Sequence, residues 1–420
     1  MKKESRPRVV VVVDGYSSGG LYPDDLRAQG VSCVHVESGA YIPPALFKTF
    51  DQEKYLKTFA AYEARNLQDL VSSLKREYEV LGVVSGTETG VELTDRLANA
   101  FGLPGNPIET SALKRDKAKM VSALASKGLR CIQSLSTKSA DEALAWVRGQ
   151  TQFPVIVKPL KSAGTDGVEV CADESALRNA FKTKLGKLDA FKNANDSLLV
   201  QELIVGAEYI VDTVSIEGLH YLNSVWKYRK ARHGAHVLYE VEELLEYSAP
   251  EVPLIFEYLK KVLDALELQF GPGHSELFID ERGPVLVETG ARPNGVGGPR
   301  LSKRAVGLSQ IDLTVEAILR PDEFRKRIGT RYEVSEFCLR AYFISEADGV
   351  LKQIKNLDRI EALPSFARMD LEVETGGALQ KTTDLFSSPG SLDFFHKDRA
   401  QLWKDYEAFQ KIETDGVFIV

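Results

Sequence analysis

The sequence lacks the features of membrane, disulfide-linked and nucleic-acid-binding proteins. No apolar run approaches the roughly 20 residues that span a bilayer, and the five valines before Asp14 are also too few for a signal peptide. The four cysteines show no CxxC or Cys/His spacing, so buried free thiols are expected. A formal charge of -7 leaves no basic excess for phosphate backbones. These absences favour a cytoplasmic protein that acts on small molecules and binds neither nucleic acid nor membrane.

The N-terminal part of the chain alternates predicted strands and helices. With 420 residues, 44% hydrophobic and 27% charged, the chain should fold throughout into several packed units. Apolar runs predict strands at 8–14, 31–37 and 79–86, and the stretch 51–78 reads as a long helix. This order predicts a βαβαβ unit. The turn after Asp14 lacks GxGxxG, so a Rossmann-like scaffold without a dinucleotide is favoured.

A second unit begins after the Pro- and Asn-containing residues 106–111. A strand, loop and strand are predicted at 153–170, and its tip could close over a ligand. Antiparallel strands are predicted at 198–226, and a strand pair joined by a tight turn at 274–290. The last 100 residues are predicted to contain both strands and helices, with a solvated surface of acidic and basic side chains and few candidates for a functional site.

Lys158 stands in the apolar run VIVKP, where an unpaired ammonium would be costly to bury. An anionic partner such as phosphate would satisfy it, although a solvent-facing strand lysine is the alternative. In the loop SAGTDG, Gly164 and Gly167 permit backbone N–H groups to approach phosphate oxygens. Without Lys158, this loop would read as an ordinary turn.

Glu276 and Glu288 fall in two apolar strands of the predicted hairpin, and a buried carboxylate is rare without a partner. Two hard oxygen ligands suit Mg²⁺ that is bound together with nucleotide phosphates. Arg292 follows in a glycine-rich loop, where it could stabilise developing negative charge or simply cap the loop. His274 could orient a substrate or a glutamate, or be structural.

Three further places leave alternatives open. Gln201 and Glu202 end a strand and could bind an adenine edge, with Glu208 near a ribose, or could form a polar strand end. Glu88 lies between a strand end and a helix, where it could meet a substrate amine or stabilise the helix N-terminus. The basic run 226–234 is interpreted as a solvated surface in preference to a phosphate contact.

Taken in order, these motifs resemble the ATP-grasp superfamily, and most of all its bacterial L-amino acid ligases that make dipeptides. The resemblance implies an α/β (α+β) ATP-grasp fold in three parts. These are a Rossmann-like domain at 1–112, a central region with the lid subdomain at 113–198, and at 199–420 a C-terminal ATP-grasp domain with the metal site and a C-terminal extension.

The resemblance also assigns roles to individual residues. Relatives carry Glu-x-Asn-x-Arg at the second metal strand, whereas Gly290 stands here in place of the asparagine, and Asn294 could replace it. The implied sites are Lys117, Lys158, Ser162, Ala163, Gly164, Gln201, Glu202, Leu203 and Glu208 for the nucleotide, Glu276 and Glu288 for the metal, Arg292, Lys158 and His274 for catalysis, and Glu88, Asn294 and Gly297 for substrate.

The activity implied is ATP-dependent ligation of a carboxylate to an amine. Two amino acids would give a dipeptide through an acyl phosphate, with release of ADP and phosphate. ATP and Mg²⁺ are the implied cofactors, with two ions expected and Mn²⁺ as a substitute. An ATP-grasp carboxylase, a nucleotide-biosynthesis ligase and a non-catalytic nucleotide-binding protein are the alternatives. A homodimer is left open.

Overall fold

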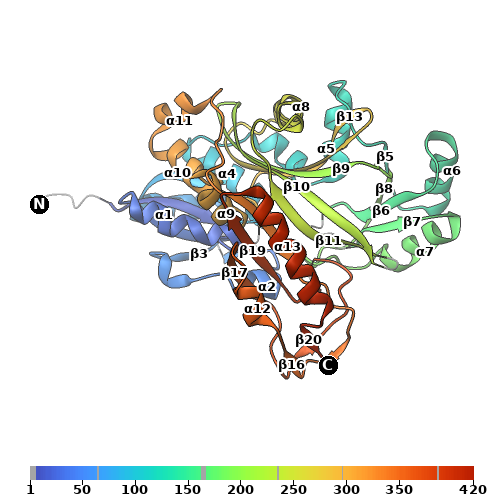
Figure 1. Ribbon diagram of the computed structural model, residues 1–420. Helices are drawn as coiled ribbons and strands as arrows, with labels where there is room; N and C mark the ends of the chain where they lie inside the picture. Colours follow the sequence, from blue (N-terminus) through green and yellow to red (C-terminus); the bar gives the residue numbers. More distant parts are fainter. Residues whose placement is uncertain (1–5, 64–65, 162–166, 234–235, 296, 386) are drawn as a thin grey trace, which may run out of the picture.

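The computed structural model describes residues 6–420 except 64–65, 162–166, 234–235, 296 and 386. Figure 1 shows a parallel sheet near the N-terminus, a small sheet with its two helices at the opposite edge, and a long antiparallel sheet between them. In the described part of the chain, no helix is long and apolar enough to cross a membrane. All four cysteines are free, and all but the partly exposed Cys131 are buried.

The N-terminal sheet has four parallel strands in the order β3-β2-β1-β4. The valines of β1 are all buried, as expected for a strand covered on both faces. The strands are β1 Arg8–Val13, β2 Ser32–Glu37, β3 Thr58–Ala60 and β4 Glu79–Ser85; the helices are α1 Tyr22–Ala28, α2 Pro44–Phe47, α3 Leu67–Glu77 and α4 Val91–Phe101; short 3-10 helices are η1 Ser17–Leu21, η2 Gln52–Lys54, η3 Ala61–Glu63, η4 Glu88–Gly90 and η5 Ile108–Lys114.

The three predicted strands of this unit are confirmed, but the long helix expected over 51–78 is wrong. Of the described residues in this stretch, only the C-terminal part forms an α-helix, α3, which begins where the Asn66 side chain accepts a hydrogen bond from the Asp69 amide. Upstream, β3 pairs in parallel with β2, with His35 opposite Thr58. Pairing at the sheet edge satisfies backbone groups that a helix would have satisfied internally, so tertiary context overrides the local pattern.

The lid sheet is antiparallel, in the order β5-β8-β6-β7. Helices α6 and α7 pack on one face, against Val155 and Val157 of β6. Because side chains alternate along a strand, Ile156 and Lys158 face the other way, toward the large sheet. The elements are β5 Ser134–Thr137, α6 Ala140–Gln150, β6 Val155–Pro159, β7 Glu169–Cys171, α7 Glu174–Lys184 and β8 Leu198–Glu202.

The large sheet is antiparallel, in the order β13-β12-β9-β10-β11-β14-β19-β17. Helices α5 and α8 contribute to the core of one half, and α13 packs on the other half, at the C-terminal end of the chain. Its elements are α5 Lys117–Ser126, β9 Ala207–Ile216, β10 Leu219–His233, β11 His236–Leu244, α8 Glu251–Ala265, β12 Gly271–Asp280, β13 Gly283–Gly290, β14 Phe337–Tyr342, β17 Phe366–Leu371, β19 Gly390–His396 and α13 Arg399–Thr414.

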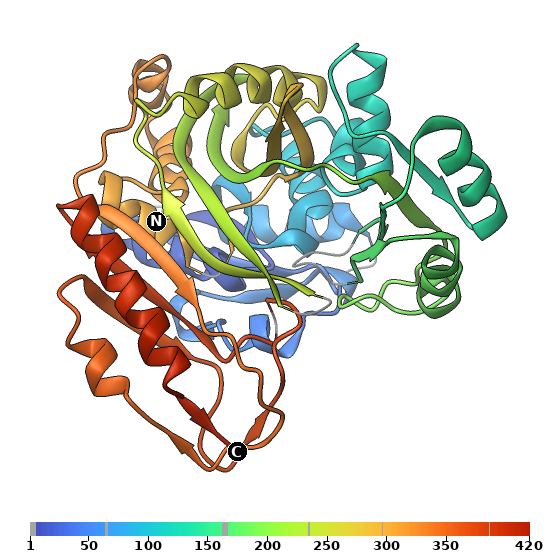
Figure 2. The same ribbon diagram turned by 45° about the vertical axis from the view of Figure 1, so that its right-hand side comes forward.

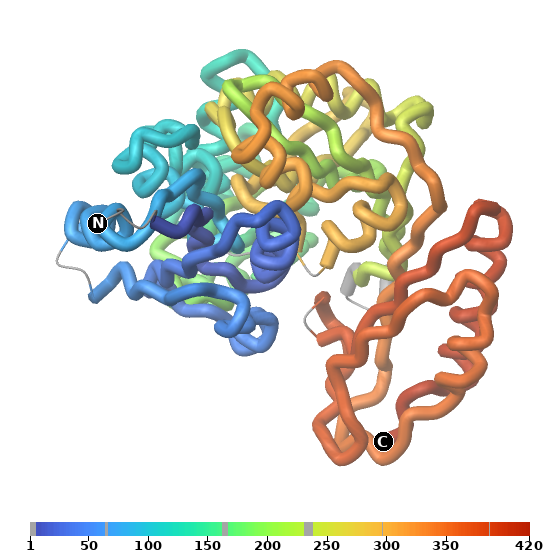
Figure 3. Tube along the Cα trace, turned by 90° about the vertical axis from the view of Figure 1, so that its left-hand side faces the viewer, coloured from blue at the N-terminus to red at the C-terminus, as the bar shows by residue number. Residues whose placement is uncertain are grey.

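Helix α10 joins the N-terminal unit to the large sheet, because Ile311 and Val315 pack into the same core as Val10, Val12 and Tyr22. Figure 2 shows the lid unit and α13 on opposite sides of the long strands, and in Figure 3 the C-terminal residues form a lobe that extends away from the N-terminal unit. The remaining elements are α9 Gly298–Val306, α10 Gln310–Leu319, α11 Pro321–Arg327, β15 Gly349–Val350, β16 Gln353–Ile354, α12 Leu357–Glu361, β18 Ala378–Leu379 and β20 Phe418–Ile419.

The three-part division of the chain stays a proposal. The lid sheet includes β8, which ends at Glu202, so this sheet continues a few residues past the expected boundary at 198. The long sheet from 207 to 396 carries both the strands with the glutamates and the C-terminal lobe, which supports treating 199–420 as one domain.

Candidate active site

A pocket of about 700 Å³ lies between the lid sheet and the large sheet. Its inner part is walled by apolar side chains, and Val168 and Val170 of the lid are 44% and 49% exposed there. An apolar slot between two sheets suits a flat heterocycle. The lining residues outside this slot include Lys117, Lys158, Gln201, Glu202, Leu203, Glu208, Tyr228, Lys230, Glu276 and Glu288.

The side chains of Gln201 and Glu202 are already engaged at the edge of this slot. Gln201 donates to the Ser134 hydroxyl at 2.8 Å, and Glu202 accepts from the Gln133 amide at 3.0 Å. Their side chains are therefore held in place by the neighbouring strand, and main-chain groups near Leu203 remain the candidates for an adenine edge. Ser162, Ala163 and Gly164 of the expected lid loop lie outside the described residues.

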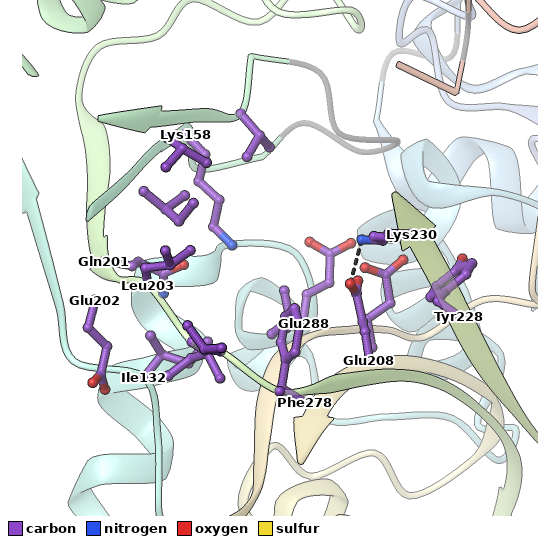
Figure 4. A pocket seen from close by; sticks show the side chains of 18 of the residues that line it. Ile132, Lys158, Gln201, Glu202, Leu203, Glu208, Tyr228, Lys230, Phe278 and Glu288 are labelled. Carbon is purple, nitrogen blue, oxygen red and sulfur yellow. Dashed lines mark ion pairs between the residues drawn. The ribbon is translucent and has the colours of Figure 1, made fainter. Parts of the chain in front are cut away.

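Lys158 is 6% exposed, and Figure 4 shows its ammonium directed into the pocket toward Glu288. Burial and the charge of Lys117 lower its pKa to about 8, although nearby glutamates partly offset this effect. Lys117 begins α5 and forms an ion pair with Glu288 at 2.6 Å. Two lysines that line the same pocket are suited to contact nucleotide phosphates.

Glu276 and Glu288 are directly opposite residues of the β12–β13 hairpin, which brings their Cβ atoms about 5 Å apart. The register shifts immediately afterwards, as at a β-bulge, a feature common beside active sites. Burial opposes ionisation of Glu276, but the hydrogen bond and charge of His274, with Lys230 and Arg292, lower its pKa to about 2. The ionised Glu276 and the opposite Glu288 form a pair of acidic side chains that is suited to bind a cation.

The basic run 226–234 is not a solvated surface at its first positions, so that prediction is wrong. Trp226 is buried, and Tyr228 and Lys230 line the pocket, where Lys230 forms an ion pair with Glu208 (Figure 4). Burial raises the pKa of Glu208, and Lys230 opposes that rise. Strand β10 lies between β9 and β11, so alternate side chains face the ligand side. The signal available in the sequence was the spacing of Trp226, Tyr228 and Lys230, which stand two residues apart and therefore lie on one face of the strand.

A second cavity of about 150 Å³ adjoins the first, and Tyr228 and Glu276 line both. Ser17 and Gly86–Glu88 reach it from the carboxyl ends of β1 and β4, between which the strand order of the parallel sheet reverses. That is where open α/β sheets bind ligands. A Cβ on Gly86 would lie 2.4 Å from the Asp14 carbonyl oxygen, so this loop packing requires glycine.

Glu88 is held by two arginines. Its carboxylate pairs with Arg115 at 2.6 Å and with Arg292 at 2.8 Å. Burial opposes ionisation, but the two guanidinium groups lower the pKa of Glu88 to about 2. A Cβ at Gly290 would lie 3.0 Å from the Glu88 carboxylate, so the missing side chain at 290 leaves room for Glu88. The carboxylate also lines the small cavity, and its contact with a substrate amine stays a prediction.

His274 lies between the buried Asp212 and Glu276. Its Nδ1 is 3.0 Å from Asp212 and its Nε2 is 3.8 Å from Glu276. Burial and Arg292 lower the pKa of His274, but Asp212 and Glu276 outweigh them and raise it. The Asn294 side-chain nitrogen donates to Asp212 at 3.1 Å. If Asn294 takes the place of the asparagine that relatives carry at the position of Gly290, only its side-chain oxygen is therefore available for that role. Gly297 is the N-cap residue of α9 and has φ +81.

The C-terminal lobe contributes to the small cavity, which corrects the expectation of little chemistry there. Arg340 and Tyr342 of β14 line it. Arg340 is buried and pairs with Asp393 at 2.8 Å, while the Tyr342 hydroxyl donates to Glu242 at 2.5 Å. The sequence predictions gave no role to these residues or to Arg115, which stands two residues before Lys117, and tertiary packing brings them to the site.

Comparisons with known proteins agree with this geometry. Residues 151–299 match the ATP-grasp domain family. The chain is 28% identical to dapdiamide A synthase of Enterobacter agglomerans over 410 residues, which cover 97% of this chain and 96% of that protein. It is 25% identical to the L-arginine-specific L-amino acid ligase of Bacillus subtilis over 234 residues, which cover 54% and 55%.

Among solved structures, an L-amino acid ligase from Bacillus licheniformis superposes with a TM-score of 0.76 at 18% identity and covers 99% of both chains. An N5-carboxyaminoimidazole synthase from Aspergillus clavatus gives 0.68 at 12% identity, with 98% of this chain and 99% of that chain covered. These matches show the fold. The predictions of the ATP-grasp fold, of the resemblance to L-amino acid ligases and of the ligase class are confirmed.

Proposed function

We propose that this chain, an ATP-grasp protein related to L-amino acid ligases, joins two amino acids into a dipeptide and converts ATP to ADP and phosphate. The observation that carries the proposal is the junction of two cavities at Glu276. The larger has the apolar slot and lysines that suit ATP, and the smaller has the mixed lining that suits a compact zwitterion. The carboxylate between them lies where phosphate and acid would meet.

The larger cavity fits ATP and Mg²⁺. Glu276 and Glu288 would hold the metal, and in the described part of the chain no third His, Cys, Asp or Glu joins them as a closed metal site. Phosphate oxygens would complete the coordination, which is how Mg²⁺ is held in many nucleotide sites. When bound, Mg²⁺ neutralises the phosphate oxygens; we propose two ions, with Mn²⁺ able to substitute. Lys117 and Lys158 would neutralise the remaining charge.

In the first step, a carboxylate oxygen of one amino acid attacks the γ-phosphorus of ATP, and the bond to the ADP oxygen breaks. The products are an acyl phosphate and ADP. In the second step, the amine of the other amino acid, after loss of a proton, attacks the acyl carbon. The tetrahedral oxyanion then collapses and releases phosphate. Arg292 lines the small cavity, where it would donate to this oxyanion.

Glu88 has a positioning role in this scheme. Its carboxylate accepts a hydrogen bond from Nε of Arg292 at 2.8 Å, and the Pro293 carbonyl accepts one from Nη1 of Arg292 at 2.9 Å. A guanidinium fixed in this way needs little reorganisation when negative charge develops. His274, braced by Asp212, would orient Glu276 and add positive charge at the junction of the cavities.

The size of the second cavity favours an amino acid over the larger substrates of the alternatives. A ribonucleotide acceptor needs a site in the drug-sized range of about 300 Å³ or more, whereas the cavity measures about 150 Å³. The relative named dapdiamide A synthase covers nearly the whole chain, which supports amide-bond formation between small molecules. A cytoplasmic location and a homodimer stay predictions from the sequence.

The test is phosphate release from MgATP across single and paired L-amino acids, with the nucleotide product separated by chromatography. ADP and a dipeptide mass are expected, and hydroxylamine should trap a hydroxamate from the donor amino acid when no acceptor is added. AMP and pyrophosphate would overturn the mechanism. Phosphate release that requires bicarbonate or a nucleotide precursor would retain the fold and reject dipeptide synthesis.

A further inference from the structure

Three segments that are distant in the sequence contribute apolar side chains to the small cavity. Leu46 comes from α2, Phe191 from the connection between α7 and β8, and Leu385 from the loop before β19. Ile210 and Trp226, which are opposite each other on β9 and β10, add apolar area from the sheet. The cavity therefore has an apolar compartment beside the charged group around Glu276.

Phe191 is the aromatic side chain that the lid unit adds to this compartment. It is 8% exposed, yet within the described residues it does not belong to the apolar core that α6 and α7 form with the lid sheet. Its burial therefore does not come from membership of that core. Lys192, the next residue, lies 5.4 Å over the ring of Tyr41 and so contacts the N-terminal unit.

A buried aspartate holds the loop that carries Phe191. Asp189 is 6% exposed, and its Oδ1 accepts from the backbone amides of Phe191 at 2.9 Å and Asn193 at 2.8 Å. A bridge between Leu188 and Ala194 closes the loop. An acceptor that binds amides on both sides of the tip fixes the backbone of a short loop. The Phe191 side chain is therefore presented to the cavity from a rigid support.

We propose that Phe191 determines which amino acid side chains the small cavity accepts, and that Asp189 is its positioning residue, an inference that rests on the proposed ligase activity. A cavity of about 150 Å³ holds one benzene-sized molecule. Alanine has as many non-hydrogen atoms as benzene, leucine has half as many again, and phenylalanine has twice as many. The class accepted is small amino acids of about the size of alanine, larger aliphatic ones are disfavoured and aromatic ones are rejected.

The experiment measures kcat/KM for phosphate release with L-alanine, L-leucine and L-phenylalanine. Phe191→Ala should raise the preference for phenylalanine over alanine by roughly tenfold or more, since a misfit of a few methylene groups changes discrimination by at least that factor. Phe191→Trp should act in the opposite direction and disfavour leucine relative to alanine. Leu188→Ala, on the same loop and 58% exposed, is the matched control and should leave both ratios unchanged.

The positioning role of Asp189 is tested by measuring KM and kcat separately in its variants. Asp189→Ala should raise KM for the amino acid several-fold while kcat and ADP affinity change little, because the loop loses its support but the phosphate site does not. Asp189→Asn keeps one acceptor oxygen and should restore most of the KM. Equal losses in ADP affinity and kcat in both variants would mean that Asp189 only maintains the fold.

The proposed ligase activity and the proposed role of Phe191 would be contradicted by different results. If the unaltered protein releases no phosphate with any amino acid, the proposed ligase activity is rejected. If it is active but Phe191→Ala and Phe191→Trp both keep the unaltered ratios, the ligase activity stands and Phe191 is excluded as the specificity residue. ADP affinity by calorimetry checks that each variant is folded. Should Phe191→Ala fail that check, Phe191→Leu replaces it, with the same expected direction.

Discussion

The two cavities that meet at Glu276 draw on very different lengths of chain. The nucleotide pocket is lined by residues between Lys117 and Glu288, which come from the lid sheet and the adjoining strands of the large sheet. The small cavity is lined by residues from Ser17 to Leu385, contributed by the N-terminal unit, the lid, the large sheet and the C-terminal lobe. A pocket built from neighbouring strands can be read from local patterns, whereas one built from four parts cannot.

The two cavities also differ in how their charges are compensated. Lys158 faces the larger one with a lowered pKa, and its neighbour Lys117 adds positive charge. In the smaller cavity, Arg292 is paired with Glu88 and Arg340 with Asp393. The larger cavity also holds Glu276 beside Glu208 and Glu288, which are paired with lysines, so a triphosphate would enter it together with a cation on the glutamates, whereas the smaller cavity, which is close to balanced, suits a zwitterion.

The largest effect is expected at the facing glutamates of the β12–β13 hairpin, of which Glu276 lines both cavities. Glu276→Gln and Glu288→Gln should each lower the rate of ADP formation by roughly a thousandfold or more, because an amide cannot replace an anionic metal ligand. Initial rates across a Mg²⁺ titration would measure this loss. Glu281→Gln, in the exposed turn of the same hairpin, is the control. Unaltered rate and Mg²⁺ dependence in both variants would remove the metal from this hairpin.

The next largest effect distinguishes the role of the small cavity from that of the larger one. Arg292→Lys should lower kcat roughly 100- to 1,000-fold while ADP affinity stays within about twofold, since a point charge cannot reproduce the donors of a planar guanidinium. Steady-state kinetics would measure kcat, and calorimetry would measure the affinity for ADP. Arg325→Lys, in an exposed ion pair on α11, is the control. A parallel loss of ADP affinity would place Arg292 in the nucleotide pocket instead.

Lys158→Ala should act on the larger cavity alone. We expect ADP affinity to fall roughly 10- to 100-fold, the range for losing a charge-assisted hydrogen bond in a dry site, and the melting temperature of the ligand-free protein to stay the same or rise, because a buried ammonium is removed. Lys182→Ala on the exposed face of α7 is the control. Calorimetry that finds equal affinity in both variants would exclude Lys158 from the phosphate site.

The pH dependence of ADP binding refines the same assignment. Lys158 has a pKa of about 8 in the free protein, which is below the ordinary lysine value, so it is charged below pH 8 and neutral above it. Phosphate binding requires the charged form and must take up a proton at higher pH. The Kd for ADP should therefore rise as pH rises through 8, by up to about tenfold per unit. In Lys158→Ala this rise should be absent, and in Lys182→Ala it should persist.

The smallest effect concerns the contact between Glu88 and Gly290. Gly290→Ala would place a methyl group 3.0 Å from the Glu88 carboxylate, which we expect to cost about 1 kcal/mol of strain and to lower kcat about fivefold by shifting Arg292. Nucleotide affinity should not change. Gly149→Ala, where the added Cβ meets open space on α6, is the control. A rate equal to that control would show that Glu88 adapts without moving Arg292.

What the sequence could predict about the lining of the two cavities follows the same division. Lys158, Glu276 and Glu288 could be found because a charge in an apolar strand is unusual in itself. Lys230 was missed although its spacing from Trp226 and Tyr228 placed it on the same face of β10. Arg340 was missed because no local pattern distinguishes a buried arginine from an exposed one until its partner Asp393 is known.

Continuous apolar runs determined the strands of the parallel N-terminal sheet and of the lid hairpin. The facing pair Glu276 and Glu288 could be predicted from single strands because side-chain direction in a strand depends only on the parity of the position. The tertiary structure alone decided that 58–60 is an edge strand, that Glu88 binds two arginines, and that Phe191 from the lid lies beside Leu385 and Leu46 around one cavity. Such contacts between distant segments depend on how several units pack together, and that packing is set by the whole chain at once.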